Sequence, residues 1–266
     1  MSLRWSEHVC AALMPGAVAA AVWPRGWARD PIERAALACA AAGPGPRWSA
    51  AANGLRDWIS GRGTQRTGVR IVLSNQFVRY VVVPWRDSLC RLAEREALAV
   101  HLLRETYGEL VERWQVKVAP GAWGAPALAC AVDREFLGAL QALCPGTPRS
   151  LDATEPLLMV AFNQFRREIA RDACLMVLEP ECLCCAVFRG GQWSAVNTMR
   201  IGPQGWSQVL VDRQIALHGL SLDFPVYLYD ASGRADVDGD DLAYRLLTPS
   251  DRRRADPALA LFSQAA

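Results

Sequence analysis

The chain has 266 residues, of which 52% are hydrophobic and 21% are charged, and its formal net charge is +2. A chain of this length can bury one large core or two smaller ones, so we expect a two-lobed globular protein, and the composition excludes a disordered chain. The small net charge does not favour a polyanion, so no nucleic acid is expected as a partner. Lys117 is the only lysine, which excludes a P-loop or Schiff-base lysine elsewhere in the chain.

The nine cysteines are odd in number and irregularly spaced, which is typical of reduced thiols in a cytosolic protein. Cys182, Cys184 and Cys185 form a cluster that could be interpreted as a metal site. It lacks a second pair of cysteines, and no histidine lies at ligand spacing from it. We therefore predict no metal and interpret the cluster as part of a strand, with Cys182 and Cys184 on one face and Cys185 on the other. Metal or redox chemistry is the alternative.

The apolar residues 9–23 imitate a secretory signal only weakly. Glu7 and His8 remove the positive flank, and Pro15-Gly16 interrupts the apolar run, so we expect no signal peptide. No stretch reaches the roughly 18 uninterrupted apolar residues that a membrane-spanning helix needs. The sequence therefore predicts a cytoplasmic protein without direct membrane insertion.

The chain begins with a strand-turn-strand pattern. Residues 8–14 and 17–23 predict two strands joined at Pro15-Gly16. The Ala-, Pro- and Gly-rich stretch 23–48 fits either a third strand or a surface loop. A helix is expected over 49–59, ended by a Gly-Arg-Gly sequence.

The stretch 69–86 is the one around which the rest is organised. Its two runs, Val69 to Leu73 and Phe77 to Val83, are rich in β-branched and aromatic residues and fit either a hairpin or two consecutive strands. Pro84 closes the second run, and Asp87-Ser88 is expected to cap a long helix. An apolar stripe on this helix, which includes Leu92, Leu103 and Leu110, predicts core packing, with a partner surface as the alternative.

The remaining elements alternate in the same way. Strands are expected at 114–118, 127–132 and 151–154, with helices at 134–143 and from Glu155-Pro156 to about Ile169. The second half predicts three strands in a meander at 174–178, 182–188 and 193–201. A helix at about 205–218, a strand at 226–229, a loop at 230–239 and a short helix at 240–247 follow.

Three strands and a helix, occurring twice around a βαβ insert, are what the actin-like (RNase H-like) ATPase fold requires. Four segments carry a more specific resemblance: 68–85 (GVRIVLSNQFVRYVVVPW), 127–144 (ALACAVDREFLGALQALC), 151–165 (LDATEPLLMVAFNQF) and 174–202 (CLMVLEPECLCCAVFRGGQWSAVNTMRIG). In this order they resemble the PilM family of cytoplasmic, actin-like type IV pilus assembly proteins and the related cytoplasmic domain of the type II secretion protein GspL. The resemblance covers most of residues 6–234.

The resemblance implies an α/β protein with the two-lobe actin-like fold and a reduced second lobe. The first lobe is expected at 1–152, with an inserted subdomain at about 69–125, and the truncated second lobe at 153–266. The implied partner is the cytoplasmic tail of an inner-membrane pilus or secretion assembly protein. The protein would then lie at the inner membrane through that partner, in an oligomeric state that the sequence leaves open.

Three turns depart from what an active actin-like ATPase needs. No acidic residue stands between Val9 and Arg29, and the first turn contains Pro15 and Gly16. The second phosphate turn contains Glu179 and Pro180, and the proline removes an amide donor that a phosphate would require. The adenine-side turn keeps Gly233 alone where the family has a pair of glycines. We therefore expect no nucleotide binding and no cofactor.

These features predict a pseudo-ATPase scaffold that is not an enzyme, with an active ATPase that has divergent phosphate turns as the alternative. Phe77, Arg79 and Tyr80 are the candidate partner-binding residues, because a strand arginine beside aromatic rings suits a peptide carboxylate or carbonyl. A solvated Arg79 is the alternative for that residue.

An acidic loop could suggest a calcium site, and its members are Asp236, Asp238, Asp240 and Asp241. A calcium-binding loop needs glycine at its sixth position and glutamate at its twelfth, and this loop has neither. We expect a solvated loop instead.

Overall fold

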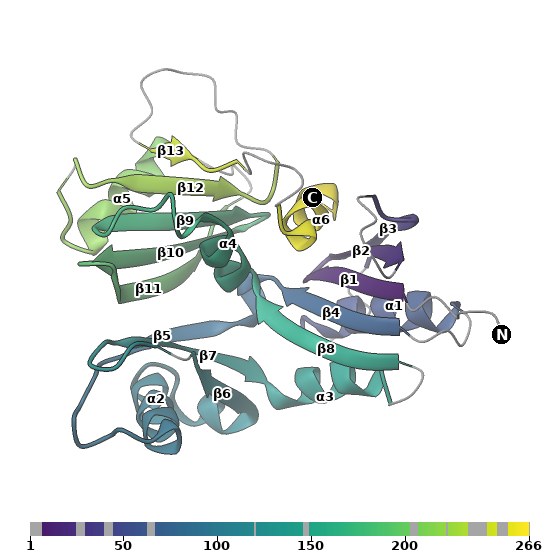
Figure 1. The fold of residues 1–266 in the computed structure, drawn as a ribbon, viewed down its shortest axis with the longest axis horizontal. Coiled ribbons are helices and arrows are strands. Elements are labelled where there is room, and N and C mark those ends of the chain that lie inside the picture. Colours follow the sequence, from purple (N-terminus) through teal and green to yellow (C-terminus); the bar gives the residue numbers. More distant parts are fainter. Residues whose placement is uncertain are drawn as a thin grey trace. The chain divides into compact units, whose positions relative to one another are not determined.

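The computed structural model describes residues 7–24, 30–39, 45–62, 67–119, 121–145, 149–202, 207–221, 223–233, 244–248 and 255–265 (Figure 1). The chain divides into two compact units. Unit 1 comprises Met1–Phe77, Arg134–Val160 and Pro249–Ala266. Unit 2 comprises Val78–Asp133 and Ala161–Thr248.

Unit 1 is built on a five-stranded mixed sheet with the order β3-β2-β1-β4-β8. Strands β1 (Glu7–Met14), β2 (Ala17–Pro24) and β3 (Glu33–Ala38) form an antiparallel meander. Strand β1 also pairs in parallel with β4 (Thr67–Leu73), which pairs in parallel with β8 (Arg149–Pro156). Strand β3 therefore shows that the stretch 23–48, which the sequence left open, contains a third strand.

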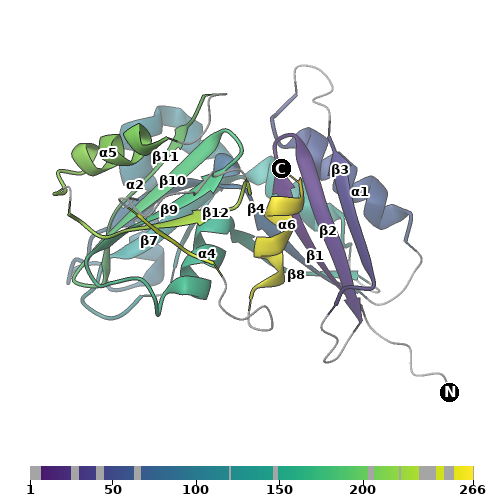
Figure 2. The same cartoon turned by 90° about the horizontal axis from the view of Figure 1, so that it is seen from above.

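Helices cover both faces of this sheet. Figure 2 shows α1 (Ser49–Ser60) on one face of β1 and β2 and α6 (Pro257–Ala265) on the other. Helix α3 (Arg134–Ala142) packs beside α1, and the ring of Trp48 stacks on that of Phe136 at 5.1 Å. Because both faces are covered, β1 and β2 are almost continuously apolar and buried rather than alternating.

Arg70 on β4 holds α6 in place. Its Nε donates to Glu155 Oε2 at 2.6 Å and its Nη1 to Asp256 Oδ1 at 2.7 Å. Asp256 also accepts the backbone N–H of Ala258 at 3.0 Å, so it caps the helix that begins at Pro257. Burial lowers the pKa of Arg70, but the hydrogen bonds to the two carboxylates outweigh burial and raise the pKa above its ordinary value.

Unit 2 contains a second five-stranded sheet with the order β11-β10-β9-β12-β13. Strands β9 (Ala173–Glu179), β10 (Cys182–Arg189) and β11 (Gln192–Arg200) form the predicted meander. Strand β12 (Val226–Asp230) pairs in parallel with β9, and β13 (Arg245–Leu246) pairs in parallel with β12.

Each face of this sheet has its own cover. Helix α5 (Gln208–Leu217) packs Val211 and Ile215 onto one face. On the other face, the end of α4 (Leu157–Phe165) places Phe162 against Phe188 at 5.2 Å and Phe165 against Tyr229 at 5.5 Å. Both faces of β9 and β10 are therefore buried.

A smaller sheet with the order β5-β7-β6 completes unit 2. Its strands β5 (Arg79–Val83), β6 (Trp114–Val118) and β7 (Ala127–Asp133) are antiparallel and are covered by α2 (Leu92–Tyr107), which runs into the 3₁₀ turn η2 (Gly108–Arg113). Val83, Ala99, Val118, Ala127 and Ala129 form the apolar layer between helix and sheet.

The organising stretch does not form a hairpin. Strand β4 belongs to the sheet of unit 1 and β5 to the small sheet of unit 2, so the alternative of two consecutive strands is correct. Phe77 lies in the 3₁₀ turn η1 (Asn75–Phe77), not on the second strand, because the chain turns there between two sheets. Asn75 is fully buried, and its Oδ1 accepts the backbone N–H of Leu158 at 3.1 Å, which fixes the first turn of α4.

The predicted cap of the long helix is wrong. Helix α2 begins at Leu92, where Glu94 Oε2 accepts the backbone N–H of Arg91 at 3.0 Å. Asp87 instead accepts a hydrogen bond from Trp85 Nε1 at 2.8 Å. The apolar stripe is only partly buried as well, since Leu92 is 57% exposed.

Three predictions for the other elements also need correction. Helix α4 ends at Phe165, four residues before the expected Ile169. Residues 245 and 246 form strand β13 rather than helix, because they pair with β12. No helix was predicted near the end of the chain, where α6 lies.

The compact units do not follow the predicted lobe boundaries at 152 and 153. Helix α6 packs against β1, β2 and β3, so the end of the chain groups with unit 1. Strand β5 contacts β11, so residues 78–133 group with unit 2. The assignment of 1–152 and 153–266 to the two lobes of the actin-like fold stays a prediction. Among the described residues, none of the helices is long and apolar enough to span a membrane.

Candidate functional site

The first predicted nucleotide turn is a two-residue hairpin between β1 and β2. Pro15 and Gly16 form the turn, and both flanking strands are held in register from Glu7 to Pro24. The carbonyl of Gly16 accepts the backbone N–H of Cys39 at 2.8 Å, which ties the turn to the end of β3. Pro15 has no N–H, so this turn has at most one amide to offer to a phosphate.

The second predicted nucleotide turn is equally tight. Pro180 and Glu181 join β9 to β10, and Glu181 adopts a positive φ of 58°, which is uncommon for a residue other than glycine. The side chain of Glu179 is fully buried at the end of β9. Burial raises the pKa of Tyr80 well above its ordinary value, and the thiols of Cys184 and Cys130 and the carboxylate of Glu179 raise it further.

The turn predicted to correspond to the adenine side is closed by its own aspartate. Asp230 Oδ1 accepts the backbone N–H of Ser232 at 2.8 Å, the Ser232 hydroxyl at 2.6 Å and the backbone N–H of Gly233 at 3.1 Å. The backbone N–H of Ala231 donates to the carbonyl of Leu178 at 2.8 Å. The three consecutive amides of this turn are therefore bound within the protein.

The structure places the three predicted partner-binding residues differently from one another. Phe77 packs edge-on against Phe136 at 5.1 Å. Arg79 opens β5 half-buried, and its Nη1 donates to the carbonyl of Val78 at 3.0 Å. Tyr80 is only 8% exposed. Of the three side chains, the guanidinium of Arg79 is the one with a polar group suited to a peptide.

The cysteine cluster lies on strand β10, as the sequence predicts. Cys182 and Cys184 lie on the face opposite to that of Cys185, which belongs to the core beneath α5. Burial raises the pKa of Cys184, and it raises that of Cys130 on β7 to about 11. Among the described residues, no group of three or more histidines, cysteines or acids is arranged to hold a metal ion.

A thiol and imidazole cluster lies beneath α5, and the sequence analysis missed it. The Sγ atoms of Cys174 and Cys185 are 3.2 Å apart, and Cys185 is hydrogen-bonded to His218. His218 Nε2 lies 3.2 Å from Asn197 Oδ1, whose Nδ2 donates to Gln214 Oε1 at 2.9 Å.

The hydrogen bond with Cys174 and burial together raise the pKa of Cys185 well above its ordinary value. At neutral pH the thiol is thus protonated, and a protonated thiol is a poor nucleophile and a poor metal ligand. The sequence carries no signal for this cluster, because its members come from four elements.

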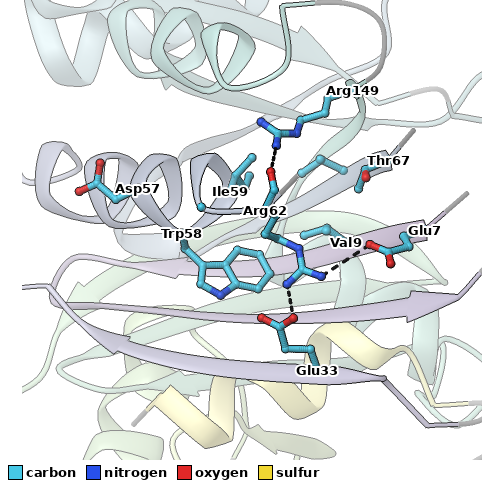
Figure 3. Close-up of a pocket in the computed structure, with 11 residues that line it drawn as sticks. Glu7, Val9, Glu33, Asp57, Trp58, Ile59, Arg62, Thr67 and Arg149 are labelled. Atoms are coloured by element: carbon cyan, nitrogen blue, oxygen red, sulfur yellow. Dashed lines mark hydrogen bonds and ion pairs between the residues drawn. The ribbon is translucent and has the colours of Figure 1, made fainter. Parts of the chain in front are cut away.

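Unit 1 contains one further site of interest, a pocket of about 480 Å³ at the edge where β1 and β4 begin. Figure 3 shows the guanidinium of Arg62 between Glu7 and Glu33, with the carbonyl of Arg62 accepting a hydrogen bond from Arg149. The guanidinium also lies over the ring of Trp58 at 4.9 Å. The positive charge of Arg62 is therefore paired with the carboxylates of Glu7 and Glu33 within the pocket wall. The pocket also lies at the opposite end of β1 from Pro15 and Gly16, so it is not the predicted nucleotide turn.

The acidic loop with Asp236, Asp238, Asp240 and Asp241, which we predict to be solvated rather than calcium-binding, lies outside the described residues.

Comparison with known proteins gives likeness in structure only. No protein-family model matches the chain, and no curated protein matches it. The cytoplasmic domain of EpsL, an inner-membrane component of the type II secretion system of Vibrio cholerae, matches with a TM-score of 0.57 and 13% identity, over 98% of this chain and 95% of that one. A structure of the PilM-PilN type IV pilus biogenesis complex matches with a TM-score of 0.60 and 14% identity, over 97% and 98%.

A Bacteroides thetaiotaomicron protein with an actin-like ATPase fold and unknown function also matches, with a TM-score of 0.51 and 9% identity, over 88% and 84% of the two chains. At such identities the likeness establishes the fold and not the activity. The predicted resemblance is thus confirmed as a structural one: this chain is an α/β protein with the actin-like ATPase fold, similar over nearly its whole length to the EpsL cytoplasmic domain and to the PilM-PilN structure.

Proposed function

We propose that this protein is a pseudo-ATPase scaffold of a type IV pilus or type II secretion assembly platform, which binds the cytoplasmic tail of an inner-membrane protein. The full-length likeness to the EpsL cytoplasmic domain and to the PilM-PilN complex supports the assembly role. In this role the protein is cytoplasmic and lies at the inner membrane through its partner.

The proposed loss of nucleotide binding rests mainly on the turn at Asp230, whose backbone amides are already hydrogen-bonded within the protein. Its carboxylate accepts the amides of Ser232 and Gly233, which an active turn would leave for a ligand. The carboxylate also adds a negative charge where an anionic nucleotide would approach. Pro15 and Pro180 each remove an amide from the other two turns.

Arg79 is the residue that we propose to bind the tail. It begins β5, and a guanidinium forms two parallel hydrogen bonds with a carboxylate, or single ones with backbone carbonyls. Tyr80 is buried and Phe77 packs against Phe136, so Arg79 is the member of the predicted set that the binding test addresses.

The test is a binding titration with labelled synthetic peptides that reproduce the cytoplasmic tails of co-encoded inner-membrane proteins. Arg79→Glu should weaken binding about tenfold or more, because the charge reversal repels a tail carboxylate. Arg213→Glu is the matched control, since Arg213 is an exposed arginine on α5, and it should bind as the wild type does. Failure of every tail to bind, or equal binding by the Arg79→Glu variant, would contradict the proposed site.

A further inference from the structure

One end of the small sheet in unit 2 brings a helix start and two loops together. Strand β5 ends at Val83, which pairs with Ala127 at the start of β7. Helix α2 begins nearby at Leu92, after the loop 84–91. The second loop precedes β7 and includes the described residues 121–126. Figure 1 shows α2 running along this sheet.

Arg95, in the first turns of α2, is a buried cation. It is only 8% exposed and lies in the row of α2 residues that faces the sheet, together with Ala99 and Leu103. Its guanidinium lies over the ring of Trp85, 5.2 Å from the centroid. The Nε and Nη2 atoms are fully buried and have no hydrogen-bond partner among the residues that the structure describes.

The acidic side chains near Arg95 in the sequence are engaged elsewhere. Glu94 accepts the backbone N–H of Arg91, and Asp87 accepts Trp85 Nε1. Glu96 lies 3.6 Å from Lys117 Nζ. A buried guanidinium without a matching anion is unfavourable, because it has lost its hydration and gained no charged partner.

An apolar surface adjoins this cation. Trp123 contacts Trp85 edge-on at 4.6 Å and is itself 77% exposed. Leu92, in the first turn of α2, is 57% exposed. Trp123 is thus an exposed tryptophan beside a half-buried tryptophan and an arginine, and these are the residue types that contribute most to protein–protein interfaces.

We propose that Arg95, Trp85 and Trp123 form a binding site for an acidic, partly apolar peptide segment of another protein. One carboxylate of the segment pairs with the guanidinium of Arg95, and its apolar neighbours pack against Trp123 and Leu92. A single carboxylate matches the charge of the Arg95 guanidinium, and the positive end of the α2 dipole adds to its stabilisation. Trp85 covers the guanidinium, so the loop 84–91 moves aside when the carboxylate enters. This site is separate from Arg79 and does not depend on tail binding or on the loss of nucleotide binding.

The probe is a fluorescein-labelled, end-capped peptide of alternating leucine and glutamate, titrated by fluorescence anisotropy. A second peptide with glutamine in place of glutamate tests the requirement for charge, and free glutarate tests whether a small carboxylate suffices. Wild type should bind the glutamate peptide at least about tenfold more tightly than the glutamine peptide, and glutarate only weakly. Raising the salt concentration should weaken binding of the glutamate peptide.

Arg95→Met keeps the apolar stem and removes the charge, and it should bind the glutamate peptide about tenfold more weakly. Arg104→Met is the matched control on the same helix, because Arg104 is exposed and pairs with Glu112, and it should bind as the wild type does. Trp123→Ala removes an exposed side chain, so it should fold normally and bind several-fold more weakly.

Thermal unfolding separates a binding role from a structural one. Without peptide, Arg95→Met should unfold at the same or a higher temperature, because it removes an unmatched buried cation. With the peptide, only the wild type should be stabilised. If the wild type binds both peptides equally or neither, or if Trp123→Ala and Arg95→Met bind as the wild type does, the proposal is wrong.

Discussion

His218 and Cys185 illustrate how a single contact in unit 2 makes stability depend on pH. The hydrogen bond with Cys185 raises the pKa of His218, and this effect exceeds that of burial, which lowers it. A histidine whose folded-state pKa is raised stabilises the fold fully below its unfolded pKa of about 6.5. That contribution is lost as the pH rises through the higher, folded-state pKa.

We predict that Cys185→Ala costs about 1–2 kcal/mol of unfolding free energy from the small cavity, plus the pH-dependent contribution of the hydrogen bond. The free-energy difference between wild type and variant should therefore be larger at pH 5.5 than at pH 8, as measured by urea titration. Cys184→Ala, which lies on the other face of β10, is the control and should show a difference that is independent of pH in this range.

Metal content checks the structural role of these cysteines independently. We expect the same metal content in wild type and in both variants, measured by elemental analysis after purification. Stoichiometric zinc that is present in the wild type and lost in the variants would overturn the interpretation of the cluster as plain strand residues.

At the scale of elements, Arg70 forms a polar attachment between α6 and the sheet of unit 1. Arg70 is part-buried and binds Glu155 and Asp256, and Asp256 also caps the helix. The apolar side of α6 buries Leu261 and Phe262 against the sheet. The charged cluster thus orients the helix, while apolar burial supplies most of the favourable free energy.

We predict that Arg70→Met lowers the free energy of unfolding by about 1–2 kcal/mol, because charge-assisted hydrogen bonds are lost while solvent screening limits the effect. Limited proteolysis should then cut the variant faster near residues 255–265. Arg56→Met is the control, since Arg56 is exposed on α1 and donates a local hydrogen bond to Asn53. Equal cleavage rates for Arg70→Met and wild type would mean that α6 is held by its apolar contacts alone.

At the scale of the whole molecule, the actin-like fold is present, and the three turns that we predict to correspond to nucleotide-binding turns are closed or proline-bearing. A fold that hosts ATPases does not by itself carry their activity, because binding depends on a few amides and acids at the turns. In the proposed role, the protein keeps the actin-like architecture and uses its surfaces to bind partners.

We predict that magnesium-ATP does not raise the unfolding temperature of the protein. A bound nucleotide at about 100 times its dissociation constant would add about 2.7 kcal/mol of stability, which a thermal shift assay detects easily. Magnesium alone and magnesium with adenosine are the controls. A magnesium-dependent shift of that size with ATP would favour the alternative, an active ATPase with divergent turns, and would leave the Arg95 site untouched.

The sequence alone determined the elements that are held by local pairing. The β1-β2 hairpin and the β9-β10-β11 meander follow from apolar runs separated by two-residue turns, and the opposite orientation of Cys184 and Cys185 follows from the period of a strand. The order of these elements also predicted the actin-like fold, which the three solved structures described above confirm.

Only the tertiary structure decided which distant segments pair. Strands β4 and β5 are neighbours in sequence but join different sheets, because their partners β8 and β7 lie far along the chain. Residues 245 and 246 become a strand because they pair with the edge of β12. Helix α6 docks through Asp256 and Arg70, which are 186 residues apart in the sequence. Arg95 likewise could not be identified as a site from the sequence, where it is an ordinary charged residue of a helix. It becomes buried only through packing against Trp85 and the sheet. Local periodicity specifies which residues form strands and helices, whereas long-range pairing decides which side chains become buried together.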